Sequence, residues 1–288
     1  MKTLKTFFCF LLLLAPGFVS AQDGYIKETP ALAYWVVGDK PAVVIVLHGG
    51  PGAAHDYLRP EWDALSTVAR VIYYDQRGCG KSGRADCYSW KTHVDDLKRV
   101  IKALANGKKV FLAGSSWGHT LALLYASTYP EDVKGIILSG TTPWLGKGME
   151  AQDCSFYLPD IKRIQPDYNI DTFHYSTLAA AGQQGSKKQL ESHGPSSSFT
   201  IASMKEAPVL EQLKQVKQPV LLFESLGQGA CDALYREHLK DQARQFAGIL
   251  PNLVIHTIPD ACHDPWLSHT AEFFATCTAF IQARDAEK

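Results

Sequence analysis

The chain has 288 residues, enough for one large α/β domain with an insertion, and 46% of them are hydrophobic, as in ordinary globular proteins. Lysine plus arginine equals aspartate plus glutamate at 29 each, so the formal net charge is zero. A balanced charge gives no support for binding to nucleic acid or to an anionic membrane surface, and we expect neither partner.

Residues 1–21 have the pattern of a secretory signal. Lys2 and Lys5 give a charged start, Phe7 to Leu14 form an apolar run, and Val19-Ser20-Ala21 is a small-residue cleavage site. The apolar run is shorter than the roughly 20 residues that span a bilayer. The sequence therefore predicts export to the periplasm or the medium, with cleavage near Ala21 and no stable membrane insertion afterwards.

The seven cysteines fit an exported protein in one respect. Cleavage would remove Cys9 and leave an even set, which allows disulfides, although buried free thiols fit the pattern equally well. No spacing matches a C-x-x-C zinc site, and we expect neither metal nor cofactor. The remaining cysteines are Cys79, Cys87, Cys154, Cys231, Cys262 and Cys277.

Apolar runs of strand length alternate with segments of helical period along most of the chain. This alternation predicts an α/β fold with a mostly parallel central sheet flanked by helices. Strands are expected at 31–37, 42–47, 70–74, 110–113, 133–139, 219–223 and 253–258, and helices at 90–104, 120–128 and 271–283.

Between the strands at 133–139 and 219–223 the periodicity weakens. The intervening segment mixes aromatic residues with Gly/Ser-rich pieces and is too long for a plain connection. We interpret 141–217 as an inserted cap or lid over the site, with 22–140 and 218–288 forming the core of the domain.

Two loops follow predicted strands. In His48-Gly49-Gly50-Pro51-Gly52 the backbone can approach a ligand closely, and because Pro51 has no N–H, Gly50 is the better oxyanion donor. The loop at 75–83 ends in Gly-Lys-Ser but lacks the earlier glycine of a phosphate loop, so we reject a nucleotide site. Asp75 and Arg77 are expected to tie this second loop together through hydrogen bonds and an ion pair.

Gly114-Ser115-Ser116-Trp117-Gly118 separates a predicted strand from a helix and matches the G-x-S-x-G nucleophile turn. Such a turn needs small residues two positions on either side of its centre, and only Ser116 has glycine at both. Ser116 is therefore the candidate nucleophile.

A serine nucleophile needs a base and an acid that orients the base, in the chain order serine, acid, histidine. His263 follows the last predicted strand, where the base belongs. Asp232 is the first aspartate after the strand at 219–223, with Glu224 as its rival. Cys231 and Cys262 each precede one of these residues, so we hypothesise a disulfide between the two loops.

Three motifs together, 48–52, 75–80 and 114–118, resemble the proline iminopeptidase branch of the α/β-hydrolases, serine peptidase family S33. The resemblance implies the α/β-hydrolase fold with Ser116 as nucleophile, His263 as base and an aspartate near Asp232. It also implies an oxyanion hole formed by the N–H groups of Gly50 and Trp117, and it implies no metal or cofactor.

The resemblance further implies an aminopeptidase-like serine hydrolase that releases N-terminal proline from short peptides by acyl transfer. Two alternatives remain. One is an esterase or amidase that acts on a small molecule with the same triad, and the other is a non-catalytic binding protein on a hydrolase scaffold. The sequence leaves the oligomeric state open.

Overall fold

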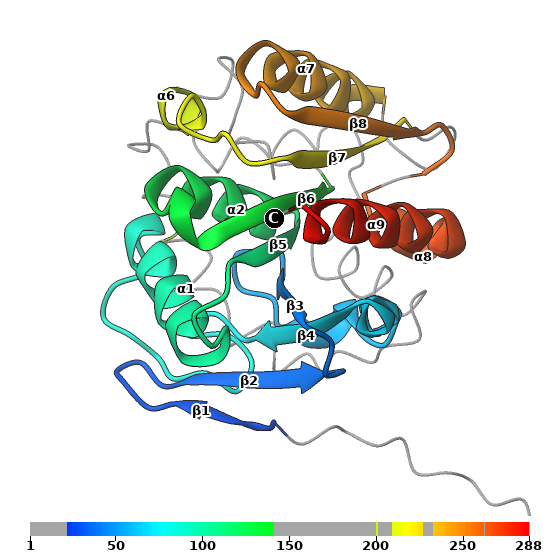
Figure 1. Ribbon diagram of the computed structural model, residues 1–288. Helices are drawn as coiled ribbons and strands as arrows, with labels where there is room; N and C mark the ends of the chain where they lie inside the picture. The colour runs from blue at the N-terminus through cyan, green and yellow to red at the C-terminus, as the bar shows by residue number, and fades with distance from the viewer. Residues whose placement is uncertain (1–21, 141–199, 201–208, 227–232, 262, 288) are drawn as a thin grey trace, which may run out of the picture.

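In the computed structural model, the described residues form an eight-stranded sheet at the centre of the molecule (Figure 1). The structure describes residues 22–140, 200, 209–226, 233–261 and 263–287. The strands lie in the order β1-β2-β4-β3-β5-β6-β7-β8. Their bounds are β1 (Gly24–Ile26), β2 (Leu32–Val37), β3 (Ala42–Leu47), β4 (Ala69–Tyr74), β5 (Val110–Ser115), β6 (Val133–Ser139), β7 (Val220–Ser225) and β8 (Leu253–Ile258).

The six strands from β4 to β8 in this order pair in parallel, and β1 and β2 add two antiparallel pairings at one edge. This arrangement confirms the predicted mostly parallel sheet. The predicted bounds of β3, β6 and β8 match the structure in full. Strand β1 has only three residues and was not predicted, because three residues are too few to show a periodic pattern.

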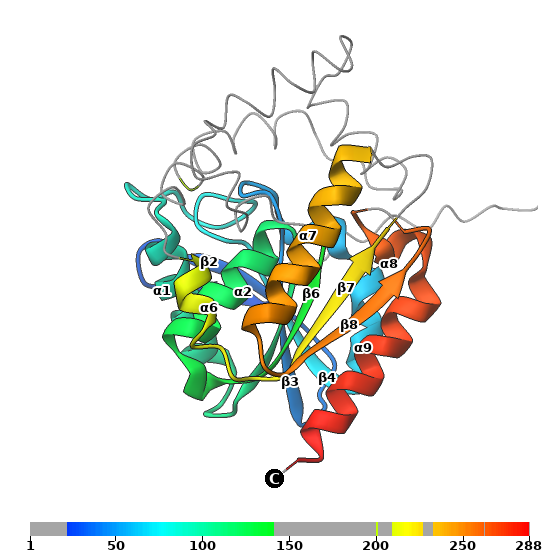
Figure 2. The same ribbon diagram turned by 90° about the horizontal axis from the view of Figure 1, so that it is seen from above.

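Helices cover both faces of the sheet. Figures 1 and 2 show α1, α2, α6 and α7 on one face and α8 and α9 on the other. The helical bounds are η1 (His55–Leu58), η2 (Glu61–Thr67), α1 (Trp90–Leu104), α2 (Trp117–Thr128), η3 (Pro130–Asp132), α6 (Val209–Leu213), α7 (Ala233–Ile249), α8 (Pro265–Ser268) and α9 (Thr270–Asp285).

Two apolar clusters fill the spaces between the sheet and its helices. Strand β3 is buried along its whole length, and its side chains alternate between the clusters, as expected of a central parallel strand. Val43 and Ile45 join the cluster under α1 and α2. Val44 and Val46 join the cluster under η2 and α9.

The predicted cap can be followed only at its end. Most of 141–217, namely 141–199 and 201–208, lies outside the described residues, so the domain boundaries stay a prediction. Helix α6 falls within the predicted range, yet Leu213 and Val216 are buried in the same cluster as α2. No helix in the described part of the chain combines the length and apolar character needed to cross a bilayer.

Candidate active site

The turn between β5 and α2 holds Ser116 in a backbone conformation that few L-residues adopt. Its φ is +55° and its ψ is −119°. Such strain concentrates at functional sites. A Cβ atom on Gly114 would lie 2.2 Å from the carbonyl oxygen of Gly118, and one on Gly118 would lie 2.1 Å from that of Leu47. Both flanking positions therefore require glycine, as the spacing predicts.

The glycine loop after β3 packs directly on this turn. A Cβ atom on Gly49 would lie 3.0 Å from Ser116 Cβ. Gly50 has φ +113°, and a Cβ atom there would lie 2.5 Å from Gly52 N, so the loop folds too tightly for another residue. Trp117 begins α2, and the first turn of a helix points its backbone N–H groups beyond the N-terminal end. The loop that carries Gly50 and the helix start at Trp117 thus meet at Ser116, and their role as oxyanion donors stays a prediction.

His263 follows β8 in sequence and comes close to the same turn in space. A Cβ atom on Gly140, the residue after β6, would lie 3.0 Å from His263 Cε1 and 3.2 Å from Ser116 N. The imidazole and the serine turn therefore flank one glycine. The structure brings the predicted nucleophile and base together, from positions 147 residues apart in the chain (263 minus 116).

The predicted acid is not placed, because Asp232 lies outside the described residues. Cys231 and Cys262 do too, so their disulfide stays a hypothesis. The rival acid Glu224 is described at the end of β7, where its Oε2 accepts a hydrogen bond of 2.8 Å from Thr257 Oγ1 on β8. This local and exposed bond gives Glu224 a structural role in pairing the two strands.

A buried polar chain that the sequence does not reveal connects three segments of the site. Gln76 N donates to His48 Nε2 (3.0 Å), so that nitrogen carries no proton, and Nδ1 donates to Gly49 O (2.9 Å). The Gln76 side chain donates to His48 O (2.9 Å) and accepts from Trp117 Nε1 (2.7 Å). A neutral His48 therefore joins the oxyanion loop to the loop after β4, and Gln76 joins both to α2.

The loop after β4 is filled by its own carboxylate. Asp75 Oδ2 accepts from Lys81 N (2.7 Å), and Oδ1 accepts from the backbone N (3.0 Å) and Nδ1 (2.9 Å) of His55. The backbone N–H of Lys81, within the Gly-Lys-Ser run, thus points to Asp75 and not outward to a ligand, which agrees with rejecting a nucleotide site. Among the described residues, His, Cys, Asp and Glu side chains form no cluster able to hold a metal ion.

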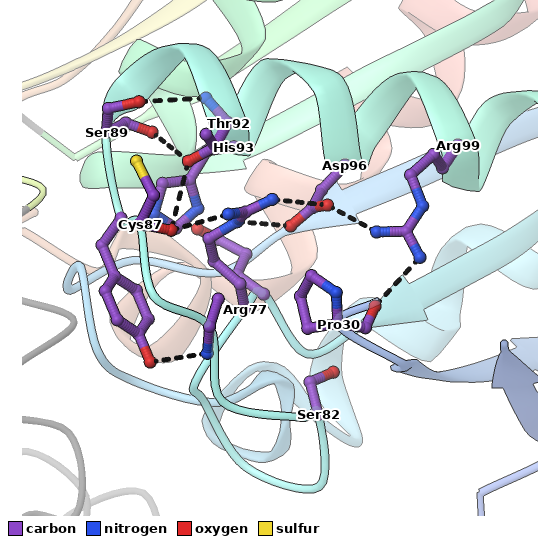
Figure 3. A network of polar contacts seen from close by, with 12 residues as sticks. Pro30, Arg77, Ser82, Cys87, Ser89, Thr92, His93, Asp96 and Arg99 are labelled. Carbon is purple, nitrogen blue, oxygen red and sulfur yellow. Dashed lines mark hydrogen bonds and ion pairs between the residues drawn. The ribbon is translucent and has the colours of Figure 1, made fainter. Parts of the chain in front are cut away.

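Arg77 anchors the same loop to α1 through a buried ion pair (Figure 3). Its Nε and Nη2 donate to the two carboxylate oxygens of Asp96 at 2.7 and 2.9 Å, and Nη1 donates to Cys87 O at 2.6 Å. Asp96 also pairs with Arg99, which donates to Pro30 O. The ion pair expected for this loop is therefore made by Arg77 with a helix, while Asp75 is bonded to His55 and Lys81.

A second buried histidine borders the site. His119 Nδ1 lies 3.1 Å from Gly140 O, an acceptor, so Nδ1 carries the proton. Burial lowers the pKa of His119 to about 4, with a smaller lowering from nearby His263. His119 is therefore neutral near neutral pH, and its hydrogen bond to Gly140 connects α2 to the segment that follows β6.

Comparison with known proteins agrees with this geometry. Residues 42–169 match the alpha/beta hydrolase fold family. A proline iminopeptidase of Thermoplasma volcanium is 39% identical over 124 residues, which cover 41% of this chain and 42% of that enzyme. A proline iminopeptidase of Heyndrickxia coagulans is 27% identical over 272 residues, which cover 83% of this chain and 90% of that enzyme. The crystal structure of proline iminopeptidase from Mycobacterium smegmatis aligns with TM-score 0.66 at 21% identity, and the alignment covers 92% of this chain and 99% of that one.

The sheet order, the serine turn and the alignment with a solved structure give the chain the α/β-hydrolase fold. Among proteins of that fold, the chain is similar in sequence to proline iminopeptidases, and it spans 42% of the length of the first of these relatives and 90% of the second. The fold predicted from the sequence and the predicted resemblance are both confirmed.

Proposed function

We propose that the chain is a serine hydrolase that works by acyl transfer. Ser116 Oγ attacks the substrate carbonyl carbon while its proton passes to His263, and the carbonyl π electrons become the oxyanion. The oxyanion collapses and expels the leaving group, which takes the proton from His263. Water then attacks the acyl-enzyme in the same way and regenerates Ser116, with Asp232 orienting the imidazole.

One observation carries this proposal. The strained Ser116 turn lies between the glycine loop after β3 and the imidazole of His263. Gly49 of the glycine loop lies beside Ser116 on one side, and Gly140 lies between Ser116 and His263 on the other. A strained serine between candidate oxyanion donors and a candidate base is the arrangement that acyl transfer requires. A binding protein on the same scaffold would have no need of all three parts.

For the substrate, the support comes from the relatives. The aligned relatives of Thermoplasma volcanium and Heyndrickxia coagulans are named proline iminopeptidases. We therefore assign this chain the release of N-terminal proline from short peptides. No metal or cofactor takes part in the proposed steps.

A substrate comparison tests the assignment. Purified chain is assayed with proline 4-nitroanilide and with 4-nitrophenyl acetate, alongside Ser116→Ala. We expect the higher kcat/KM on the proline anilide, and loss of both activities in the variant. Turnover of the ester alone would replace the aminopeptidase assignment with an esterase. Equal turnover by Ser116→Ala would contradict the nucleophile.

We also propose that the chain is exported, on the strength of the pattern in residues 1–21. N-terminal sequencing of the protein recovered from the periplasm or medium of an expressing cell is expected to begin at Gln22. Recovery of the uncleaved chain from the cytoplasm alone would contradict export.

A further inference from the structure

Tyr57, in the short helix η1 after the glycine loop, lies close to the serine turn but is not among the predicted triad and oxyanion-hole residues. The space next to Gly49 shows this contact. A Cβ atom built on Gly49 would lie 2.9 Å from Tyr57 Oη and 3.0 Å from Ser116 Cβ. The phenol and the nucleophile therefore border the same glycine.

The hydroxyl is held in place by the oxyanion loop. Gly49 N donates to Tyr57 Oη at 2.7 Å. On its other side the phenol ring lies near the indole of Trp266 on α8, three positions past the proposed base, with ring centroids 6.5 Å apart. Tyr57 thus contacts both the oxyanion loop and the segment that follows His263, and its half-buried ring has little freedom to turn away.

The direction of that hydrogen bond decides what the hydroxyl can do. The Tyr57 oxygen accepts from Gly49 N, and the hydroxyl of Ser115, the residue before the nucleophile, is a second hydrogen-bond neighbour of the phenol. Because the Gly49 N–H is a donor, the proton of the phenol's own O–H group points away from it. Accepting a hydrogen bond also polarises the O–H group and strengthens it as a donor. Burial, and after it the negative charge of Asp264, raise the pKa of Tyr57 above its ordinary value and outweigh the lowering by its hydrogen bonds with Ser115 and Gly49, so the phenol keeps its proton near neutral pH.

We propose that the Tyr57 hydroxyl is a third hydrogen-bond donor to the oxyanion formed at Ser116, beside the N–H groups of Gly50 and Trp117. The inference rests on the proposed acyl-transfer function. It adds a side-chain donor to a hole otherwise made of backbone groups. No proton is transferred, because Tyr57 only strengthens its hydrogen bond as negative charge develops on the substrate oxygen.

Tyr57→Phe removes the O–H group and keeps the ring. Loss of one oxyanion donor lowers kcat by about 10²–10³-fold. We expect a fall of about 10² in kcat on proline 4-nitroanilide with little change in KM, and the same loss of affinity for benzeneboronic acid, whose adduct with serine is tetrahedral. Titration with a fluorophosphonate counts the competent serines, so kcat is expressed per active site.

Tyr88→Phe is the matched control. The Tyr88 hydroxyl also accepts from a loop backbone N–H, that of Ala85, at 3.0 Å. It lies in the loop before α1, away from the contacts described for Ser116, so we expect its kcat to equal that of the unaltered chain.

Two results would overturn the inference while leaving the proposed function intact. One is a Tyr57→Phe variant with unchanged kcat per titrated serine, and the other is a loss of kcat with boronate affinity unchanged. A parent chain that the fluorophosphonate does not label would overturn the proposed function, and this inference with it.

If Tyr57→Phe does not fold, 3-fluorotyrosine placed at position 57 keeps the bond from Gly49 and makes the hydroxyl a stronger donor. Tighter boronate binding then supports the donor role. Unchanged or weaker binding overturns it.

Discussion

Gly140 separates the two side chains on which the proposed chemistry depends. It directly follows β6 and has φ +68°, and a Cβ atom there would meet both His263 Cε1 and Ser116 N within 3.2 Å. A single methyl group at this position would therefore change the distance between base and nucleophile, which makes Gly140 the most sensitive place to test their juxtaposition.

Gly140→Ala is expected to lose most of its activity, because the methyl group pushes His263 away from the serine turn. Gly107→Ala is the matched control, since Gly107 also has a positive φ of +74° but a Cβ atom there would have no neighbour within 4 Å among the described residues. A non-glycine residue in this conformation costs about 1–3 kcal/mol in either variant. Urea unfolding measures that shared cost in stability, and kcat on a proline arylamide measures the difference in activity between the two variants. Equal activity in the two variants would show that Gly140 does not space the site.

Single residues also show where sequence reasoning succeeds and where it stops. Ser116 could be found because a strained turn imposes glycine at fixed offsets, and His263 could be found because the base follows the last strand. Gln76 and Tyr57 could not. Gln76 bonds to Trp117, which is far away in the chain, and Tyr57 borders the same glycine as Ser116. No periodic pattern in the sequence marks a loop side chain that points into the molecule.

At the scale of structural elements, the loop after β4 is built around the buried carboxylate of Asp75. Burial alone would raise the pKa of Asp75, but hydrogen bonds and electrostatic attraction from His55 outweigh it, and the pKa falls below its ordinary value of 3.8. The folded state therefore binds this proton less readily than the unfolded state. Such a carboxylate stabilises the fold above its unfolded-state pKa, and that stability is lost as the pH falls through the folded-state pKa.

Asp75→Asn should accordingly lower the free energy of unfolding near neutral pH. The difference in unfolding free energy between the variant and the unaltered chain should shrink as the pH falls below 3.8. Chemical denaturation at a series of pH values measures this difference. Asp39→Asn, which alters an exposed carboxylate in the loop between β2 and β3, is the control and is expected to leave the unfolding free energy unchanged. A difference for Asp75→Asn that stays constant down to the acid limit would contradict the role given to His55.

Regular elements were predictable to within a few residues because burial imposes a period on them. Helix α1 begins at Trp90 and ends at Leu104, as its apolar face predicts, and the Ser89 side chain caps it by accepting from Thr92 N. Helix α2 is buried on nearly all sides, so its first turn lacks an amphipathic pattern, and the prediction placed its start three residues late. Helix α7 was not predicted as an element.

At the scale of the whole molecule, the parallel sheet explains why distant residues meet. The carboxyl ends of neighbouring parallel strands lie at one edge of a sheet, and ligands bind there in open α/β folds. The segments after β3, β5, β6 and β8 contribute Gly49, Ser116, Gly140 and His263 in turn. The alternation of strands and helices was enough to predict this gathering, but the contacts between the loops depend on packing that the sequence does not display.

Labelling with a fluorophosphonate, followed by peptide mapping, identifies the nucleophile. We expect one adduct on Ser116, no adduct in Ser116→Ala, and a retained adduct in Ser115→Ala, which removes the neighbouring hydroxyl in β5. An unlabelled parent chain, or a Ser116→Ala variant labelled as strongly as the parent, would contradict the role of Ser116 as the nucleophile.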